Sequence, residues 1–364
     1  MVKFNGFEHG IGIGGWLTNY KRFHVLKPEQ INVITTGDME HFASYITEWD
    51  IENIFKMGFD HVRLGFDQVV LEKDDGTYRE ETFKHIDDFL DWCEKYGLNV
   101  VLNLHKGLGS YCDVETPISL FEDAGLQGRF IKLWEEFERR YHDREGVVFE
   151  LLNEVKGVEP KLWNDLAERA VNAIRKQNKT RKIIVGTTDW NAPYMLDKLK
   201  IFDDENVIYT FHFYAPFEFT HQRGILQPST CFYNRDMPYP GDIEIYRGYG
   251  REVFGWKNPY KEYSIMDEKF IRDALKPVIA FVNAHPDKIL WCGEFGNIRH
   301  AKLVWREKWF SDVITVFKEN NIPYAVWNYL STPNDGNRFS LVDDDNRQIL
   351  SERLLNVLLG KERV

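Results

Sequence analysis

Two apolar segments of the chain end in a glutamate. The run VVFELLNE at 147–154 stops at the polar pair Asn153 and Glu154, and the run KILWCGE at 288–294 stops at Glu294. A continuous apolar run of this length is typical of a buried parallel strand, so each carboxylate is expected where its strand leaves the core. Most enzymes that hydrolyse a glycosidic bond use a pair of carboxyl groups, and two strand ends would supply such a pair here.

Strand and helix patterns alternate along the chain, and these elements would position the two carboxylates. Strand-like runs are expected over 7–16, 61–66, 98–104, 147–154, 182–187, 206–214, 288–294 and 322–329. Apolar residues at helical spacing predict helices over 48–57, 80–96, 120–141, 159–177, 194–200, 267–284, 305–320 and 353–359. Repeated units of this length favour closure into a (β/α)8 TIM barrel over an open doubly wound sheet.

One interval between strand ends is far longer than the others. The chain between His212 and Glu294 holds an additional segment, 216–263, which is rich in Tyr, Pro, Gly and Arg and has weak periodicity. Such a segment is typical of an insertion in a loop rather than of an independent domain. We therefore expect a single catalytic domain over residues 1–364, with the insertion between strand 6 and helix 6 and over the active face.

The composition restricts the partners of the chain. The net charge of -11 and the pI near 5.6 argue against nucleic acids and anionic membranes, because phosphate binding depends on Lys and Arg. No apolar run approaches the roughly 18 residues that a membrane helix needs. A neutral substrate fits better, and the 15% of aromatic residues could stack on sugar rings or form an aromatic core. We expect a monomer.

Other sequence features exclude several kinds of site. Cys93, Cys112, Cys231 and Cys292 form no CxxC pair and lack metal-like spacing, so free thiols are expected, with a Cys112–Cys231 disulfide as the alternative. The acidic run 343–346 is expected to form an exposed turn rather than a metal site. The chain has no HExxH motif, P-loop or GxSxG motif, so neither a metal nor a cofactor is expected. No signal peptide is visible, which fits a cytoplasmic protein or a mature secreted form without its leader.

Seven short stretches stand at or near the predicted strand ends. They are GIGIGGW, HVRLGFD, VVLNLH, FELLNE, FHFYAPFEFTHQ, WCGEFG and AVWNY, and they extend from Gly10 to Tyr329. In this order they resemble glycoside hydrolase family five, a clan A family of retaining enzymes with a (β/α)8 barrel. The nearest resemblance is to clostridial-type endoglucanases with an inserted subdomain after strand six, in which THQ, YNR and YPG recur, here at 220–222, 233–235 and 239–241.

The resemblance implies catalytic roles for residues at these strand ends. Glu154 would be the acid/base and Glu294 the nucleophile of a retaining mechanism. In such a mechanism one carboxyl group protonates the leaving oxygen while the other attacks the anomeric carbon, at a separation of roughly 5 Å. Asn153 would bind the sugar 2-hydroxyl. Arg63 would keep Glu294 ionised, because a nearby cation lowers a carboxylate pKa.

Four further residues would bind the substrate or hold the carboxylates. By the same resemblance, Tyr214 would donate to the nucleophile and His212 would help to fix the site. His105 would contact the sugar at the cleavage point, and Trp327 would form the floor on which that sugar stacks. Taken singly, a strand-end glutamate is more often solvated, and a lone histidine is more often a core residue. Arg63 needs a partner in either case because it lies inside an apolar strand.

Several residues allow two interpretations. Trp190, Trp256 and Tyr111 could form platforms for outer sugars or simply pack against their neighbours. Val155 stands after the acid glutamate where the family commonly has proline, which should matter little because this side chain does not react. Lys106 follows the strand-three histidine where the family often has a second histidine, and this change could alter a subsite.

The sequence thus predicts a retaining endo-β-glucanase that acts on β-1,4 linkages in cellulose-type or mixed-linkage β-1,3-1,4-glucans. An exo-acting β-mannosidase or exo-β-1,3-glucanase of the same family is the alternative within the enzyme class. It would require loops that wall off one side of the cleft. A non-catalytic carbohydrate-binding barrel is a third alternative, and it predicts that one of the two glutamates is lost, whereas both are present.

Overall fold

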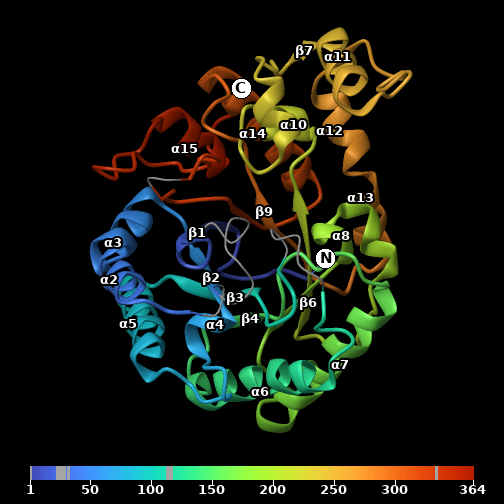
Figure 1. The fold of residues 1–364 in the computed structure, drawn as a ribbon. Helices are drawn as coiled ribbons and strands as arrows, with labels where there is room; N and C mark the ends of the chain where they lie inside the picture. Colours follow the sequence, from blue (N-terminus) through green and yellow to red (C-terminus); the bar gives the residue numbers. More distant parts are fainter. Residues whose placement is uncertain (1, 22–29, 31–32, 112–117, 333–334) are drawn as a thin grey trace.

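The computed structural model describes residues 2–21, 30, 33–111, 118–332 and 335–364. Within them, parallel strands close into a barrel in the order β1-β10-β9-β6-β5-β4-β3-β2 (Figure 1). The strands are β1 (His9–Leu17), β2 (His61–Asp67), β3 (Asn99–Lys106), β4 (Val147–Glu150), β5 (Ile183–Gly186), β6 (Val207–Phe213), β9 (Leu290–Phe295) and β10 (Tyr324–Val326). The expected eight-stranded (β/α)8 barrel is confirmed.

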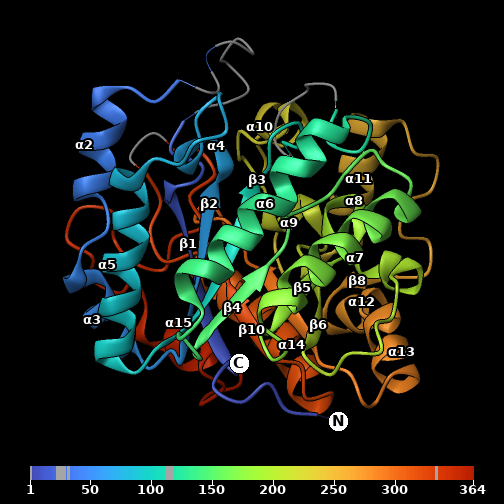
Figure 2. The same cartoon turned by 90° about the horizontal axis from the view of Figure 1, so that it is seen from below.

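Helices surround the strands, and both chain ends lie on the lower side of the barrel in Figure 2. The helices outside the predicted insertion are α2 (Thr36–Ser44), α3 (Glu48–Met57), α4 (Gln68–Leu71), α5 (Glu80–Tyr96), α6 (Ala124–Tyr141), α7 (Pro160–Gln177), α8 (Thr188–Asn191), the 3-10 helix η2 (Pro193–Lys198), α12 (Glu268–Ala274), α13 (Lys276–Ala284), α14 (Leu303–Glu319) and α15 (Glu352–Leu358). The bounds of α3 and α5 are the predicted ones. Local signals explain α3, because Thr47 and Asp50 form a capping box at its start and Gly58 ends it in a left-handed conformation.

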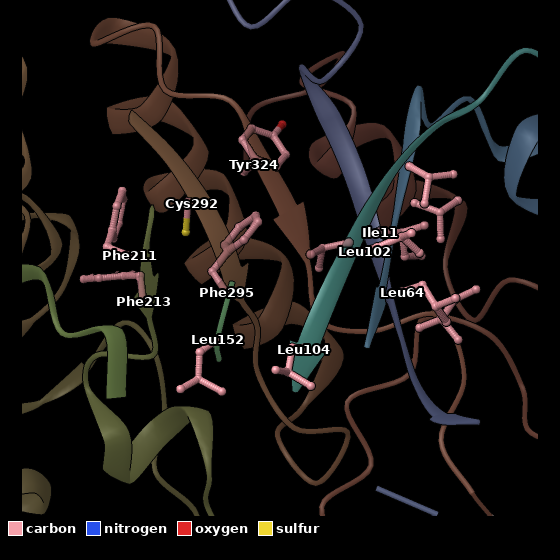
Figure 3. Packing of buried hydrophobic residues seen from close by; sticks show 14 of the residues in the cluster. Ile11, Leu64, Leu102, Leu104, Leu152, Phe211, Phe213, Cys292, Phe295 and Tyr324 are labelled. Atoms are coloured by element: carbon pink, nitrogen blue, oxygen red, sulfur yellow. The ribbon is translucent and has the colours of Figure 1, made fainter. Parts of the chain in front are cut away.

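Side chains alternate between the two faces of each barrel strand. Leu64 and Leu102 point outward into the layer between strands and helices (Figure 3). A separate cluster fills the barrel interior, and it consists of Phe4, Phe7, Val101, Val148, Ile184, Ile208, Ile289, Trp291 and Ala325. Two residues further along β3 and β4, the inward positions are the polar Asn103 and Glu150, which face each other in register. The interior therefore changes from apolar to polar toward the carboxyl ends of the strands.

Several predicted elements differ from the observed ones, and the strand expected over 322–329, for example, is only β10 over Tyr324–Val326. The expected helix 267–284 is two helices, α12 and α13, because Pro277 cannot donate the backbone hydrogen bond that would continue α12. The expected helix 194–200 is the 3-10 helix η2, preceded by the short segment α8, in which Asp189 and Trp190 have non-helical backbone angles. The strand expected over 147–154 ends at Glu150, so Glu154 lies on the loop beyond β4 and not at the last strand position.

The predicted insertion 216–263 has more regular structure than its weak periodicity indicated. It contains α9 (Phe217–Thr220), α10 (Pro228–Tyr233), the short strand β7 (Gly241–Asp242) and α11 (Ile243–Phe254), and β7 pairs with β8 (Ile265–Met266). Asp242 caps α11 and Gly255 ends it. Tyr239 donates to Asp312 of α14 over 2.8 Å. In Figure 1, α10 and α11 lie at the margin of the barrel. Two expectations stay predictions: that the chain is a single domain, and that the insertion 216–263 lies over the active face.

The remaining expectations concern thiols and membranes. Cys93 and Cys292 are buried free thiols and Cys231 is a half-buried one, whereas Cys112 lies outside the described residues. No helix of the described part of the chain is both long and apolar enough to cross a membrane.

Candidate active site

The structure links all eight residues that the sequence singled out. Arg63 lies in β2, His105 in β3, His212 in β6 and Glu294 in β9. The other four stand on the segments that follow β4, β6 and β10, and they are Asn153, Glu154, Tyr214 and Trp327. Hydrogen bonds, ion pairs and one ring stack connect them into a single group at the carboxyl end of the barrel.

Glu294 is a buried carboxylate surrounded by donors. Nη1 of Arg63 donates to its Oε1 over 2.5 Å, and the hydroxyl of Tyr214 donates to its Oε2 over 2.8 Å. Nδ1 of His212 lies 3.7 Å from Oε2. Burial by itself would raise the pKa of Glu294, but the positive charges of His212, when protonated, and Arg63 and the hydrogen bond from Tyr214 lower that pKa below its ordinary value. Glu294 is therefore held in its ionised form.

Glu154 has the opposite electrostatic environment. Its backbone has φ of 44°, and Nδ1 of His212 lies 2.9 Å from its Oε1. Burial raises the pKa of Glu154, and the negative charge of Glu294 adds to the increase, while His212 and Arg63 oppose it. Glu154 therefore keeps a proton at a higher pH than Glu294 does.

The two carboxylates lie close to each other. One oxygen of Glu154, one of Glu294 and one ring nitrogen of His212 all lie within 4.8 Å of one another. Three such side chains could hold a metal ion, but both oxygens of Glu294 already accept hydrogen bonds from Arg63 and Tyr214. The absence of a metal stays a prediction. The short separation matches the roughly 5 Å between the two carboxyl groups of retaining glycosidases.

Arg63 has a second carboxylate partner that the sequence analysis missed. Its Nε donates to Oε2 of Glu150 over 2.6 Å and its Nη2 donates to Oε1 of Glu150 over 2.9 Å. Nη2 also donates to Oδ1 of Asn153 over 2.7 Å. The signal was present in the sequence, because a glutamate inside an apolar strand needs a partner as much as an arginine does.

His105 lies between Asn153 and the ring of Trp327. Its Nε2 is 3.5 Å from Nδ2 of Asn153. Its Nδ1 lies 2.9 Å from Oδ1 of Asn103, and its Nε2 lies 3.3 Å from Nδ2 of Asn19. Its ring stacks on Trp327 with centroids 5.6 Å apart and an angle of 11° between the planes. Burial holds the pKa of His105 well below its ordinary value, with a contribution from the neighbouring Lys106, so His105 is an uncharged hydrogen-bonding group.

The glycine-rich first strand makes room for Trp327. A Cβ atom at Gly14 would lie 2.6 Å from the Trp327 ring, and one at Gly12 would lie 2.8 Å from it. Any larger residue at these positions would displace the ring. The close approach of β1 to the indole that follows β10 thus explains Gly12 and Gly14, whereas a Cβ atom at Gly10 would meet His61 and Gly15 has φ of 76°.

The residues with two interpretations lie in different surroundings. Trp190 is 48% exposed on the turn after β5, with Nζ of Lys156 5.6 Å from its ring centroid. Trp256 is 46% exposed and stacks on Phe254 at the end of α11, in the insertion. Lys106 is buried, and its Nζ lies 3.9 Å from Asp67.

Two further expectations complete the set of candidate residues. For Tyr111, burial raises the pKa of the hydroxyl, and its role as a sugar platform stays a prediction. Within 343–346, the Asp343 side chain accepts from the backbone N–H groups of Asp345 and Asn346, and the segment forms a turn, as expected.

Comparison with known proteins identifies the family. Residues 26–332 match the family model described as Cellulase (glycosyl hydrolase family 5). The chain belongs to glycosyl hydrolase family 5. The resemblance drawn from the seven stretches is thereby confirmed, and the chain is a glycoside hydrolase.

Relatives of this family 5 enzyme include proteins of nearly its own length. It is 40% identical to Endoglucanase C of Acetivibrio thermocellus, over 98% of this chain and 99% of the relative. It is 32% identical to Cellodextrinase A of Ruminococcus flavefaciens, over 88% of this chain and 85% of the relative. Among solved structures, endoglucanase Cel5A of Thermotoga maritima superposes with a TM-score of 0.73 at 26% identity, covering 97% of each chain.

Proposed function

We propose that this family 5 enzyme is a retaining endo-β-glucanase that cleaves β-1,4 linkages by double displacement. The observation that carries the proposal is the pair Glu154 and Glu294, whose oxygens lie within 4.8 Å in environments that shift their pKa values in opposite directions. A retaining glycosidase needs one carboxyl group that is protonated and a second that is ionised at the same pH.

In the first step, Glu294 attacks the anomeric carbon and Glu154 protonates the departing glycosidic oxygen. The bond from the sugar to that oxygen breaks, and a covalent bond from the sugar to Glu294 forms. In the second step, Glu154 removes a proton from a water molecule, which attacks the same carbon and releases Glu294. The sugar keeps its original anomeric configuration because it is inverted twice.

The surrounding residues would bind and orient the sugar. Asn153 is fixed through its Oδ1 by Arg63, and its amide nitrogen, which lies 3.5 Å from Nε2 of His105, would donate to the 2-hydroxyl. Trp327 would stack under the ring of that sugar, and His105, which stacks on Trp327, would donate or accept at its edge. Tyr214 would keep Glu294 aligned for attack.

The substrate class rests on the relatives. A relative named endoglucanase matches over nearly the full length of both chains, and a more distant one is named cellodextrinase. We propose cellulose-type β-1,4-glucans and mixed-linkage β-1,3-1,4-glucans as substrates, and a monomer as the acting form. Exo action on mannans or β-1,3-glucans would require a cleft closed at one end.

The mechanism is tested by replacing Glu154→Gln and Glu294→Gln singly, with Glu94→Gln on the surface of α5 as the matched control. Each active-site change should lower reducing-end release from barley β-glucan by about 100-fold to 10,000-fold or more, since each removes a reacting group. Proton NMR of the first products should show the β-anomer before mutarotation. Near-wild-type hydrolysis by either variant, or an α-anomer as first product, would refute the mechanism.

Product sizing separates endo action from exo action. With soluble cellulose derivatives or barley β-glucan, an endo-acting enzyme should release mixed oligosaccharides first and lower the viscosity early. Release of monosaccharide alone from the start would instead support the exo alternative. A parallel assay on mannan and on β-1,3-glucan determines which sugar and linkage are preferred.

A further inference from the structure

Three consecutive residues after β5 have a left-handed backbone conformation. Asp189, Trp190 and Asn191 have φ of 57°, 59° and 55°. Asn and Asp adopt this conformation occasionally and Trp rarely, so three such residues in succession indicate a turn that the surrounding fold holds in place. Here the backbone N–H of Trp190 donates to the carbonyl of Val155 over 3.2 Å, and a parallel bridge pairs Val155 with Thr188. The turn is thus joined to the residue that directly follows Glu154 in the sequence.

The turn places the Asn191 side chain against His212. Nδ2 of Asn191 lies 3.1 Å from Nε2 of His212, and both side chains are buried. The other ring nitrogen of His212, Nδ1, lies 2.9 Å from Oε1 of Glu154. Gly186, at the end of β5, leaves the space that this arrangement needs, because a Cβ atom there would lie 2.6 Å from Oδ1 and 2.8 Å from Nδ2 of Asn191.

We propose that Asn191 is a positioning residue that sets the tautomer of His212 and thereby the place of the transferable proton on Glu154. This inference rests on the proposed function, in which Glu154 is the acid/base. An amide nitrogen can only donate, so Nε2 of His212 accepts and the ring proton is on Nδ1. Nδ1 then donates to Oε1 of Glu154, which leaves Oε2 to carry the proton that goes to the leaving oxygen.

The opposite amide orientation would misdirect the proton of Glu154. If Oδ1 of Asn191 faced Nε2, a singly protonated ring would carry its proton on Nε2, and the bare Nδ1 would accept from the protonated Glu154 over 2.9 Å. The Glu154 proton would then be directed at His212 instead of at the leaving oxygen.

Other charged and titratable groups also act on this pair. Glu294 lies 3.7 Å from Nδ1 of His212. Other groups that interact electrostatically with His212 or Glu154 include Arg63, His105 and Tyr214. Burial and the charge of Glu294 raise the pKa of Glu154, whereas a positive charge on His212 would lower it. Asn191 thereby supports the protonated form of the acid without contacting the substrate.

The pH profile of an Asn191→Asp variant tests this inference. Aspartate has nearly the same shape, but its carboxylate would accept a proton from Nε2, so His212 would carry protons on both nitrogens. The resulting cation beside Glu154 should lower the Glu154 pKa and move the basic limb of kcat/KM to lower pH by about one unit or more. Tyr194→Phe is the control, because the Tyr194 hydroxyl bonds to Asp189 in the same turn without contacting His212. The acidic and basic limbs of the Tyr194→Phe pH profile should match those of the wild type.

Nitrogen-15 NMR of histidine-labelled enzyme gives a readout that does not depend on activity. In the wild type at neutral pH, the His212 signal, assigned with a His212→Asn variant, should show an unprotonated Nε2 and a protonated Nδ1. Asn191→Asp should show both nitrogens protonated, and its thermal melting verifies that it is folded. A protonated Nε2 in the wild type, or unchanged pH limbs in Asn191→Asp, would overturn the inference. If Glu154→Gln stayed active, the proposed function would fail while the tautomer would still be measured.

Discussion

Arg63 donates two hydrogen bonds to Glu150, from Nε over 2.6 Å and from Nη2 over 2.9 Å. Both side chains are fully buried inside the barrel. A bidentate pair fixes the plane of a guanidinium group as well as its charge. Because Glu150 holds two nitrogens of Arg63, the third nitrogen, Nη1, points at Glu294. Glu150 therefore orients the cation that keeps Glu294 ionised, although it lies outside the reacting group.

Replacing Glu150→Gln should weaken both the fold and the activity. Arg63 keeps the carboxylate of Glu294 as a partner but loses its charge-assisted bidentate partner, and hydrogen bonds to charged groups contribute about 1.5–3 kcal/mol of unfolding free energy. Loss of the fixed guanidinium plane should lower kcat by about tenfold to 100-fold, because small displacements of positioning groups have effects of this size. Urea unfolding and initial rates measure the two effects.

The control for Glu150 is an exposed pair. Asp88 binds Lys84 over 2.7 Å on the surface of α5. Asp88→Asn should change the unfolding free energy by no more than about 1 kcal/mol, because exposed ion pairs contribute little. If Glu150→Gln behaved like Asp88→Asn, Glu150 would have no orienting role.

The opposite pKa shifts of the two carboxylates predict a bell-shaped pH profile. Activity should rise as the pH increases through the lowered pKa of Glu294, because the nucleophile must be ionised. It should fall as the pH increases through the raised pKa of Glu154, because the acid must be protonated. Both limbs are measured as kcat/KM against pH. A profile without a basic limb would contradict the assignment of Glu154.

Tyr214→Phe should move only the acidic limb. The Tyr214 hydroxyl donates to Glu294, so its removal takes away one interaction that lowers the Glu294 pKa. The acidic limb should therefore shift to higher pH, while the basic limb stays in place because Glu154 keeps its contact with His212. Equal shifts of both limbs would show that Tyr214 acts on the site as a whole.

A substitution in the first strand should displace the aromatic floor. The added methyl group of Gly14→Ala would lie 2.6 Å from the ring of Trp327, which must then move. We expect KM for cellooligosaccharides to rise and kcat/KM to fall by about tenfold or more, because the stacked sugar loses its position. Gly128→Ala in α6 is the control, since a Cβ atom there meets nothing within 4 Å.

The Gly128→Ala control should itself change the thermal stability slightly, in the stabilising direction. Alanine in a helix interior is more favourable than glycine by about 0.5–1 kcal/mol, so this variant should melt at the same or a higher temperature with unchanged kinetics. Unchanged KM in Gly14→Ala would mean that Trp327 is not the floor of the sugar site.

Trp190 should bind a sugar beyond the cleavage point. Trp190→Ala should raise KM for longer cellooligosaccharides by several-fold and leave shorter ones little changed, because a stacked aromatic ring contributes about 1 kcal/mol. Trp49→Ala in α3 is the matched control, since Trp49 is exposed to a similar degree, 51% against 48% for Trp190. Equal effects of both changes on KM would show that Trp190 does not bind a sugar.

The differences between sequence-based expectation and structure have local causes. Pro277 divides a predicted helix because it lacks the donor that a continuous helix requires. The helix α11 was missed in the insertion, although Asp242 and Gly255 stand at its two ends as cap residues. Glu154 lies beyond β4 because the chain leaves the barrel after Glu150, and the apolar pattern by itself does not indicate where a strand stops pairing.

The sequence by itself determined the barrel and its family, because alternating strand and helix patterns and the residues at strand ends are local properties of the chain. It also indicated the candidate carboxylates Glu154 and Glu294. Only the tertiary structure decided that Arg63 is shared between Glu150 and Glu294, and that Asn191 faces His212. These contacts depend on the register and closure of the barrel. They join positions far apart in the chain, and no local pattern encodes which of many buried polar groups will meet.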